Sequence, residues 1–260
     1  MTGGTTSWTL RFLGVGGAQS PELGSASGAI EVDGRPILMI DCGAEALQAY
    51  LRQYGEPPTA VYVTHAHLDH VGGMERLFHR IWFDAEWRGR VRLIMHAALV
   101  PLVQQRVADY PEVLAEGGVN YWDGFRLVPV SSSFWLEDWR FEVFATRHHA
   151  PMTSFGVALP GSFVWTGDTR PIPEMLAVHA GRGELVAHDC ALVGNPSHTG
   201  LDDLAREYPE ELRQRLVLYH YATEADAEAM RTAGYRVARN GEAFALARPA
   251  RSAGAGEGNA

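Results

Sequence analysis

Short runs of apolar residues recur along most of the chain, and their lengths are those of β-strands. Glycine, aspartate and proline separate these runs, which occupy residues 9–15, 29–33, 36–41, 60–64, 91–95, 126–130, 140–146, 155–160, 162–168, 184–189 and 215–221. Helical spacing occurs between some of them, at residues 44–54, 71–83, 99–110, 172–180, 201–208 and 224–233. This order predicts an α/β protein, an αββα four-layer sandwich in which two sheets face each other and helices cover their outer faces.

The composition is that of a globular protein. The chain has 260 residues, of which 46% are hydrophobic and 20% are charged, and this length suffices to bury a sizeable core. We expect one domain over residues 1–247. A disordered tail is predicted for residues 248–260, where small and polar residues dominate.

Three features bear on the cellular compartment. No apolar run approaches the roughly 18 residues that a membrane span needs. The first twelve residues lack the basic and then apolar pattern of a signal peptide. Two cysteines, Cys42 and Cys190, do not make a disulfide framework. We therefore expect a cytoplasmic protein with reduced thiols and no membrane contact.

The charge balance bears on possible partners. The formal net charge is −9, from 31 acidic and 22 basic residues, and every basic residue is an arginine. These arginines are spread along the chain without a basic arm. A broad basic surface for long nucleic acid is therefore not expected, although a local patch is compatible with these numbers.

The segment AVYVTHAHLDHVGG, residues 60–73, carries the densest candidate chemistry. An apolar strand ends here, and His65, His67, Asp69 and His70 follow it within six residues. In extended backbone, residues two apart point to the same side, so His65 and His67 can grip one ion together. Asp69 and His70, past the turn, can face a second ion. Imidazole and carboxylate are the ligands that suit zinc and similar ions.

More donors must come from other strand ends. The candidates are His148 or His149, Asp168, His188, Asp189, His198 and His220. The remaining histidines, His79, His96 and His179, lie in helical or strand contexts and are interpreted as structural or solvated.

The motifs THAHLDH (64–70), His148, TGD ending at Asp168 and LYH ending at His220 together resemble the metallo-β-lactamase fold superfamily. FLGVGGA (12–18) and ILMIDCGAE (37–45) resemble its opening strands, and the resemblance covers about residues 8–247. FLGVGG, SFG (154–156) and LVLYH (216–220) are similar to the ribonuclease Z-type phosphodiesterase branch. In size and layout the chain is similar to the phage anti-Pycsar phosphodiesterases of that branch, which hydrolyse cyclic nucleotides.

The resemblance implies two divalent metal ions, with zinc expected and manganese or iron as alternatives. One ion would be held by His65, His67 and His148, the other by Asp69, His70 and His220, with Asp168 bridging them. Asp41 would orient a ligand histidine. His149 stays open as an alternative to His148, although the spacing from Thr146 favours His148.

The resemblance further implies a dinuclear metal-dependent hydrolase, a phosphodiesterase that cleaves a small nucleotide, cyclic ones first, with a hydroxide held by the metal. Asp69 and His198 are the candidate catalytic residues, and His198 would protonate the leaving oxygen unless it is a solvated loop histidine. Ribonuclease Z enzymes usually carry a glutamate motif where this chain reads AHDCA (187–191), which leaves that role to Asp189 or to no residue. The alternatives are a tRNA 3′-endonuclease, a lactonase or thioesterase of the superfamily, and a non-catalytic metal-binding scaffold.

Four aromatic residues follow the histidine motif: Phe78, Trp82, Phe83 and Trp87. They are expected in the core or in a homodimer interface, with a stacking platform for a nucleobase as the lesser alternative. The branch commonly forms homodimers, so a homodimer is predicted.

Overall fold

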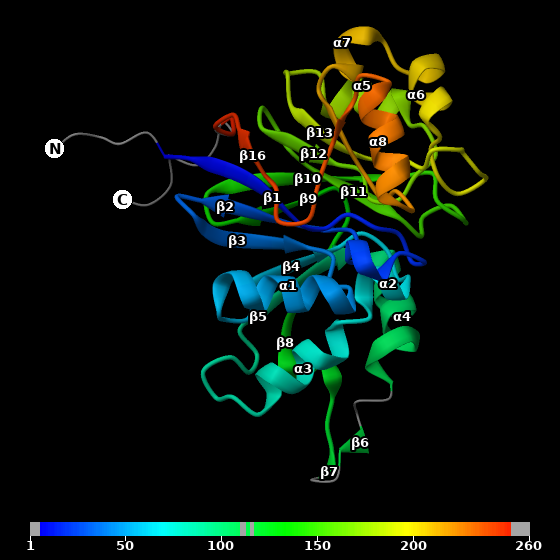
Figure 1. Ribbon diagram of the computed structural model, residues 1–260. Coiled ribbons are helices and arrows are strands. Elements are labelled where there is room, and N and C mark those ends of the chain that lie inside the picture. The colour runs from blue at the N-terminus through cyan, green and yellow to red at the C-terminus, as the bar shows by residue number, and fades with distance from the viewer. Residues whose placement is uncertain (1–5, 110–112, 115–116, 251–260) are drawn as a thin grey trace, which may run out of the picture.

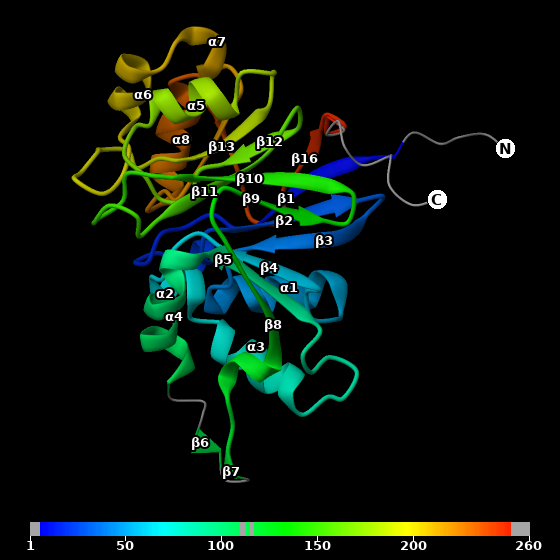
Figure 2. The same cartoon turned by 180° about the vertical axis from the view of Figure 1, so that it is seen from behind.

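A computed structural model describes residues 6–109, 113–114 and 117–250. Two seven-stranded sheets lie face to face, and helices cover the outer face of each (Figures 1 and 2). The predicted αββα sandwich is therefore confirmed. None of the helices in the described ranges has the length and apolarity needed to span a bilayer. Residues 251–260 of the predicted tail lie outside the described ranges, whereas Ala250 donates a backbone hydrogen bond to the Pro160 carbonyl at 2.9 Å.

The first sheet has the strand order β16-β1-β2-β3-β4-β5-β8. Its strands are β1 (Trp8–Gly14), β2 (Ser27–Val32), β3 (Arg35–Ile40), β4 (Ala60–Val63), β5 (Val91–His96), β8 (Phe125–Val130) and β16 (Ala243–Leu246). The β16-β1-β2-β3 part is antiparallel, and the β3-β4-β5-β8 part is parallel. A small hairpin, β6 (Val113–Leu114) and β7 (Gly117–Gly118), stands apart from both large sheets.

The second sheet has the strand order β15-β14-β13-β12-β11-β10-β9. Its strands are β9 (Ser133–Leu136), β10 (Trp139–Ala145), β11 (Phe155–Leu159), β12 (Phe163–Trp165), β13 (Leu185–Asp189), β14 (Leu216–Tyr219) and β15 (Arg236–Val237). Strands β9 to β12 are antiparallel to their neighbours, and β12 to β15 are parallel.

The helices divide between the two halves of the chain. The first half has α1 (Ala44–Tyr54), α2 (Leu68–Val71), α3 (Met74–Trp82) and α4 (Val100–Val103); the second has α5 (Pro173–His179), α6 (Leu201–Glu207), α7 (Glu210–Arg213) and α8 (Glu224–Thr232). Shorter turns are η1 (Pro21–Leu23), η2 (Ala97–Leu99), η3 (Gln104–Ala108) and η4 (Tyr121–Gly124). The predicted helix at 71–83 is divided at Gly72 and Gly73. The one at 99–110 consists of η2, α4 and η3.

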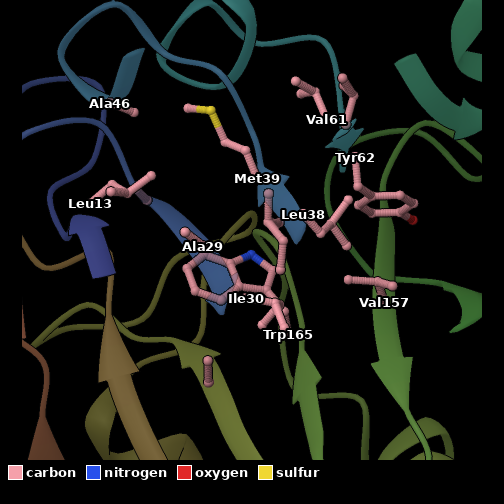
Figure 3. Packing of buried hydrophobic residues seen from close by; sticks show 14 of the residues in the cluster. Leu13, Ala29, Ile30, Leu38, Met39, Ala46, Val61, Tyr62, Val157 and Trp165 are labelled. Atoms are coloured by element: carbon pink, nitrogen blue, oxygen red, sulfur yellow. The ribbon is translucent and has the colours of Figure 1, made fainter. Parts of the chain in front are cut away.

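The core lies between the two sheets. Trp165 of β12 points toward Ala29 and Ile30 of β2 (Figure 3). Its ring stacks on Tyr219 of β14 at a centroid distance of 4.4 Å. A Cβ at Gly28 would lie 2.9 Å from the Trp165 ring, so the absence of a side chain on β2 makes room for the indole. Close packing of this kind gives the strand ends a rigid base.

One edge of the sandwich collects the carboxyl ends of strands from both sheets. Strands β3 and β4 are parallel, as are β12, β13 and β14. Strand β10 runs in the same direction as β12, because both are antiparallel to β11. The loops that follow these strands therefore meet at one edge, where ligand sites of open α/β sheets are usually found.

Candidate metal centre

The seven predicted ligands meet at this edge. Their ligand atoms form two overlapping groups, and within each group all atoms lie within 4.8 Å of one another. The first set is His65, His67 and His148; the second set is Asp69, His70 and His220; Asp168 belongs to both groups. Asp168 therefore lies between the two sets, where the predicted bridging role would place it.

The spacing of the donor atoms fits a tetrahedral metal ion. Around an ion with ligand bonds of about 2.0–2.1 Å, donor atoms lie about 3.3–3.4 Å apart. In the first set, His148 Nε2 is 3.3 Å from His67 Nδ1, and His65 Nε2 is 3.6 Å from Asp168 Oδ2. In the second set, His70 Nε2 is 3.4 Å from oxygens of both Asp69 and Asp168. Asp168 Oδ2 lies 3.8 Å from His148 Nε2 and 3.2 Å from His220 Nε2, so the separations in both sets are close to those of ligands around a shared centre.

Several of these atoms are buried and have no hydrogen-bond partner among the residues that the structure describes. They are the Nε2 atoms of His65, His70 and His220 and the Oδ1 atom of Asp168. Buried polar atoms are almost always paired, because leaving one unpaired costs free energy. Four such atoms around two centres are what a metal-binding site requires, and imidazole with carboxylate donors suits zinc, manganese or iron.

Asp41 orients the histidines of both sets. It follows β3, is fully buried, and accepts hydrogen bonds from Thr64 N and Thr64 Oγ1, both at 2.7 Å, and from His70 Nδ1 at 2.8 Å. Thr64 Oγ1 in turn lies 3.1 Å from His65 Nδ1. Both imidazoles thereby hold a proton on Nδ1 and turn the lone pair of Nε2 toward the centre. The role expected of Asp41 matches this geometry, whereas sequence reasoning did not find Thr64.

Two further contacts escaped the sequence analysis. His148 Nδ1 donates to the carbonyl oxygen of Ser197 at 2.9 Å, which leaves Nε2 for a metal. Gly17 lies against the His220 ring, and a Cβ there would come within 2.9 Å of His220 Cε1. Gly17 belongs to the run FLGVGGA, which the sequence pattern already singled out, but only the fold shows that this glycine faces the His220 ring.

The protonation equilibria differ between the two sets. Burial lowers the pKa of His65 well below its usual value and that of His67 to about 4, so both imidazoles are neutral and able to bind a metal. Burial is the largest influence on His70 and His220 and acts against their protonation. The neighbouring carboxylates, Asp168 with Asp41 for His70 and Asp168 with Asp189 and Asp69 for His220, together outweigh burial and raise both pKa values well above the ordinary value. Without metal, protons on these two histidines balance the surrounding carboxylates, and metal binding would displace them.

His198 lies at the rim of the centre. Its Nδ1 is 2.9 Å from Asp189 Oδ2, and its ring stacks on His220 with centroids 4.8 Å apart. Burial is the largest influence and lowers the pKa of His198, but the hydrogen bond that His198 donates to Asp189, together with the charges of Asp189 and Asp168, raises it overall. The structure therefore places His198 beside the ligands, with Asp189 behind it.

The other histidine candidates lie outside the two sets. The His149 ring is exposed, 4.7 Å from the His67 ring, and its backbone has a φ of 54°. His188 is buried with its Nε2 2.8 Å from the Tyr208 hydroxyl. Among the residues interpreted as structural or solvated, His79 lies 3.7 Å from Glu75 on the surface, and His96 stacks on Phe155.

The aromatic residues after the histidine motif lie away from the centre. Phe78 is fully buried and stacks on Trp82 and Tyr121. Phe83 is 58% exposed, and Trp87 is partly buried. None of the four lines the cavities at the metal centre, so the expectation of core packing fits Phe78 and the stacking platform has no support from their positions.

Two cavities flank the centre. A cavity of about 420 Å³ adjoins the first set, and its lining includes His65, His67, Leu102, Gln105, Arg106, His148 and His149. A second cavity of about 560 Å³ adjoins Asp69, and its lining includes Gly17, Ala18, His67, Leu68 and Arg106. Both volumes are in the range of small-molecule sites.

Comparison with known proteins gives the family. The family described as Anti-Pycsar protein Apyc1 matches residues 8–244. The chain belongs to the Apyc1 family. An Apyc1 protein of Saccharibacillus brassicae is 32% identical over 231 residues, covering 86% of this chain and 93% of its own. Those of Paenibacillus xerothermodurans and Bacillus phage BSP38 are 28% and 25% identical, covering 84% and 91% of this chain and 89% and 98% of theirs.

Solved structures give the fold of this Apyc1 family member independently. The metallo-beta-lactamase fold protein YhfI from Bacillus subtilis aligns with a TM-score of 0.69 at 12% identity, covering 92% of this chain and 99% of that one. A diphosphatase of the PhnP family aligns with a TM-score of 0.68 at 20% identity, covering 91% and 97%. The short form of human tRNase Z reaches 0.63 at 18% identity, covering 91% and 98%. The predicted metallo-β-lactamase fold is confirmed.

Proposed function

We propose that this Apyc1 family member is a dinuclear metal-dependent phosphodiesterase that hydrolyses a small nucleotide, with cyclic mononucleotides as the first candidates. The observation that carries the proposal is the pair of donor sets that share Asp168 at one edge of the sandwich. The family name, Anti-Pycsar protein, and the presence of phage proteins in the family both support a role in which a nucleotide signal is degraded. Structural relatives named as a diphosphatase and as yeast PDE1 are compatible with phosphate ester chemistry.

Two divalent ions, when bound, supply Lewis acidity toward the phosphate oxygens and lower the pKa of a water molecule toward neutrality. The first set would hold one ion, the second set the other, and Asp168 would touch both. Zinc is the metal proposed, with manganese and iron as alternatives, because all three accept imidazole and carboxylate donors.

The side chains of the protein then handle the protons. We assign to Asp69, whose side chain is 11% exposed, the role of accepting a proton from the attacking water, in addition to its place in the second set. As the water oxygen bonds to phosphorus, the bond from phosphorus to the leaving sugar oxygen breaks in line. His198 donates the proton that this oxygen needs, because Asp189 holds its Nδ1 and raises its pKa. A cyclic mononucleotide and one water are thus converted to a single nucleotide that carries a phosphomonoester and a free sugar hydroxyl. The proton taken by Asp69 and the proton given by His198 balance.

The charge of the chain favours a small substrate over tRNA. A protein that binds a long RNA neutralises many phosphates with lysine and arginine. This chain has a net charge of −9 and no lysine, whereas a cavity of about 420 Å³ beside the first set accommodates a small molecule. The tRNA 3′-endonuclease alternative therefore ranks below the cyclic-nucleotide activity.

The test combines metal content with a substrate panel. Elemental analysis of protein loaded with metal should find about two ions per chain, one for each donor set. The loaded enzyme should hydrolyse bis(p-nitrophenyl) phosphate and at least one of cAMP, cCMP, cGMP and cUMP, and should process precursor tRNA poorly. Efficient cleavage of precursor tRNA without turnover of any cyclic nucleotide would instead establish a ribonuclease Z activity. Activity on lactones or thioesters alone would move the protein to another branch of the superfamily.

A further inference from the structure

One arginine lines both cavities at the metal centre. Arg106 and His67 each contribute to the cavity beside the first set and to the cavity beside Asp69. The Arg106 side chain therefore lies at the boundary between the two cavities, next to a predicted ligand. Arg106 lies in the segment that follows α4 (Figures 1 and 2), and Leu68, the first residue of α2, lines the second cavity with it.

Arg106 belongs to an unusual segment. Residues Gln104–Ala108 form a π-helix that continues α4, closed by a hydrogen bond from Asp109 N to Gln104 O at 3.1 Å. Such turns are rare and occur often at functional sites, since the additional residue changes the direction of the side chains. Here Val107 is buried, while Gln105 and Arg106 are both exposed. The two polar side chains form a ridge at the cavity wall, and we call this pair the Gln105–Arg106 ridge.

The ridge has a rigid base. The Gln104 side-chain amide accepts a hydrogen bond from Trp122 Nε1 and donates one to Asp109. These contacts join the π-helix to η4, so the ridge does not depend on the packing of α4 alone. The backbone that carries the ridge is thus fixed before a ligand binds, which lowers the cost of ordering it.

The positive charge of Arg106 favours an anionic ligand. Among the described residues that line the two cavities, Arg106 is the one arginine, and the chain has no lysine. Within the described ranges, no carboxylate forms a salt bridge with it. Apart from bound metal ions, its guanidinium is thus the permanent positive charge in the lining, alone in the first cavity and beside the carboxylates of Glu45 and Asp69 in the second, and its planar fork suits a phosphate.

We propose that the Gln105–Arg106 ridge is the specificity element of this site, with Arg106 binding the phosphate group and Gln105 contacting the nucleobase. The assignment rests on the proposed phosphodiesterase function. Gln105 lines only the cavity beside the first set, where Leu102 and Ala150 provide apolar walls. A glutamine amide carries both a donor and an acceptor, which is the pattern needed to read the edge of a base.

The first test concerns Arg106. Arg106→Gln should lower kcat/KM for the preferred cyclic mononucleotide about 10- to 100-fold, mainly through a higher KM, as expected for the loss of one charge-assisted contact. Arg106→Lys should recover part of the loss, because it restores the charge without the planar fork. Arg126→Gln is the matched control, since Arg126 is an exposed arginine on β8 and lines neither cavity. Equal metal content and equal melting temperatures would show that the variants are folded.

The second test concerns the base. Gln105→Ala should change the ratio of kcat/KM among cAMP, cCMP, cGMP and cUMP by about threefold or more, the scale of a single neutral hydrogen bond. It should also reduce cyclic-nucleotide turnover more than turnover of bis(p-nitrophenyl) phosphate, which has no base. Gln53→Ala, at an exposed position of α1, is the matched control.

The outcomes separate the two proposals. Wild-type turnover of cyclic nucleotides, with Arg106→Gln and Gln105→Ala both within twofold of wild type, would overturn the role of the ridge and leave the phosphodiesterase function standing. Absence of turnover of every cyclic nucleotide by the metal-loaded wild type would overturn the proposed function and the role of the ridge with it.

Discussion

Replacing Asp41 by asparagine should weaken metal binding with little change in fold. The Asp41 carboxylate accepts hydrogen bonds from Thr64 N, Thr64 Oγ1 and His70 Nδ1, at 2.7, 2.7 and 2.8 Å. An asparagine side chain has nearly the same shape but offers one oxygen and one NH₂ group. It also tolerates the backbone φ of 60° at this position.

The direction of the effect follows from the donors around the side chain. The Thr64 backbone N–H can only donate, so the amide oxygen must stay on that side and the NH₂ group must face His70 Nδ1 and Thr64 Oγ1. His70 then accepts at Nδ1 and carries its proton on Nε2, the atom 3.4 Å from Asp69 and Asp168 oxygens. The lone pair that should bind metal is thereby blocked.

The expected magnitude is that of losing an orienting partner behind a metal ligand. Such losses reduce metal affinity about 10- to 100-fold, or about 1.4–2.8 kcal/mol. Competition with a chromophoric chelator would measure the affinity of each position, and thermal unfolding of the metal-free protein would report the fold. Asp33→Asn is the matched control, because Asp33 also has a positive φ, of 50°, but is exposed on the surface. An Asp41→Asn protein that binds both ions with wild-type affinity would refute the reasoning.

Four further outcomes are expected. His148→Ala should abolish activity and loosen one metal, while His149→Ala should do less, and the reverse ranking in elemental analysis and kinetics would move the ligand role to His149. As the pH falls from neutral, the second set should release its metal before the first set does. Carboxylates raise the pKa of the histidines in the second set, whereas burial lowers the pKa of the histidines in the first set. Metal content measured against pH should therefore pass through a plateau of about one ion per chain. Gly17→Ala should lower the metal affinity of the second set about tenfold, because a Cβ at this residue would press on the His220 ring. Unchanged metal affinity would show that the ring moves freely. Light scattering should report a homodimer, and a monomer at micromolar concentration would contradict that prediction.

Local sequence was sufficient to predict those features that depend on residues adjacent to one another in the chain. The helix predicted at 44–54 matches α1, Ala44–Tyr54, because its apolar spacing is helical and it ends at Gly55 in the left-handed region, with a φ of 80°. In the same way, His65, His67, Asp69 and His70 fall together because they are adjacent in a strand end and the turn that follows. Pattern was insufficient for short edge strands such as β9 and β16, which have few residues to show a period.

The sequence by itself determined the types of residue available, the alternation of strands and helices, and the four-residue cluster with which the centre begins. Only the tertiary structure decided which distant donors complete it. His148, Asp168 and His220 reach the cluster because the strands before them end at the same edge of the sandwich. His188 precedes Asp189 on β13, so its side chain lies on the opposite face of the strand from that of Asp189, where it is buried against Tyr208. The period of a strand tells which residues share a face, but the pairing of strands far apart in the chain depends on packing between the sheets. The same packing brings Asp41 against Thr64 and places Arg106 in the lining of both cavities, and no spacing along the chain records either arrangement.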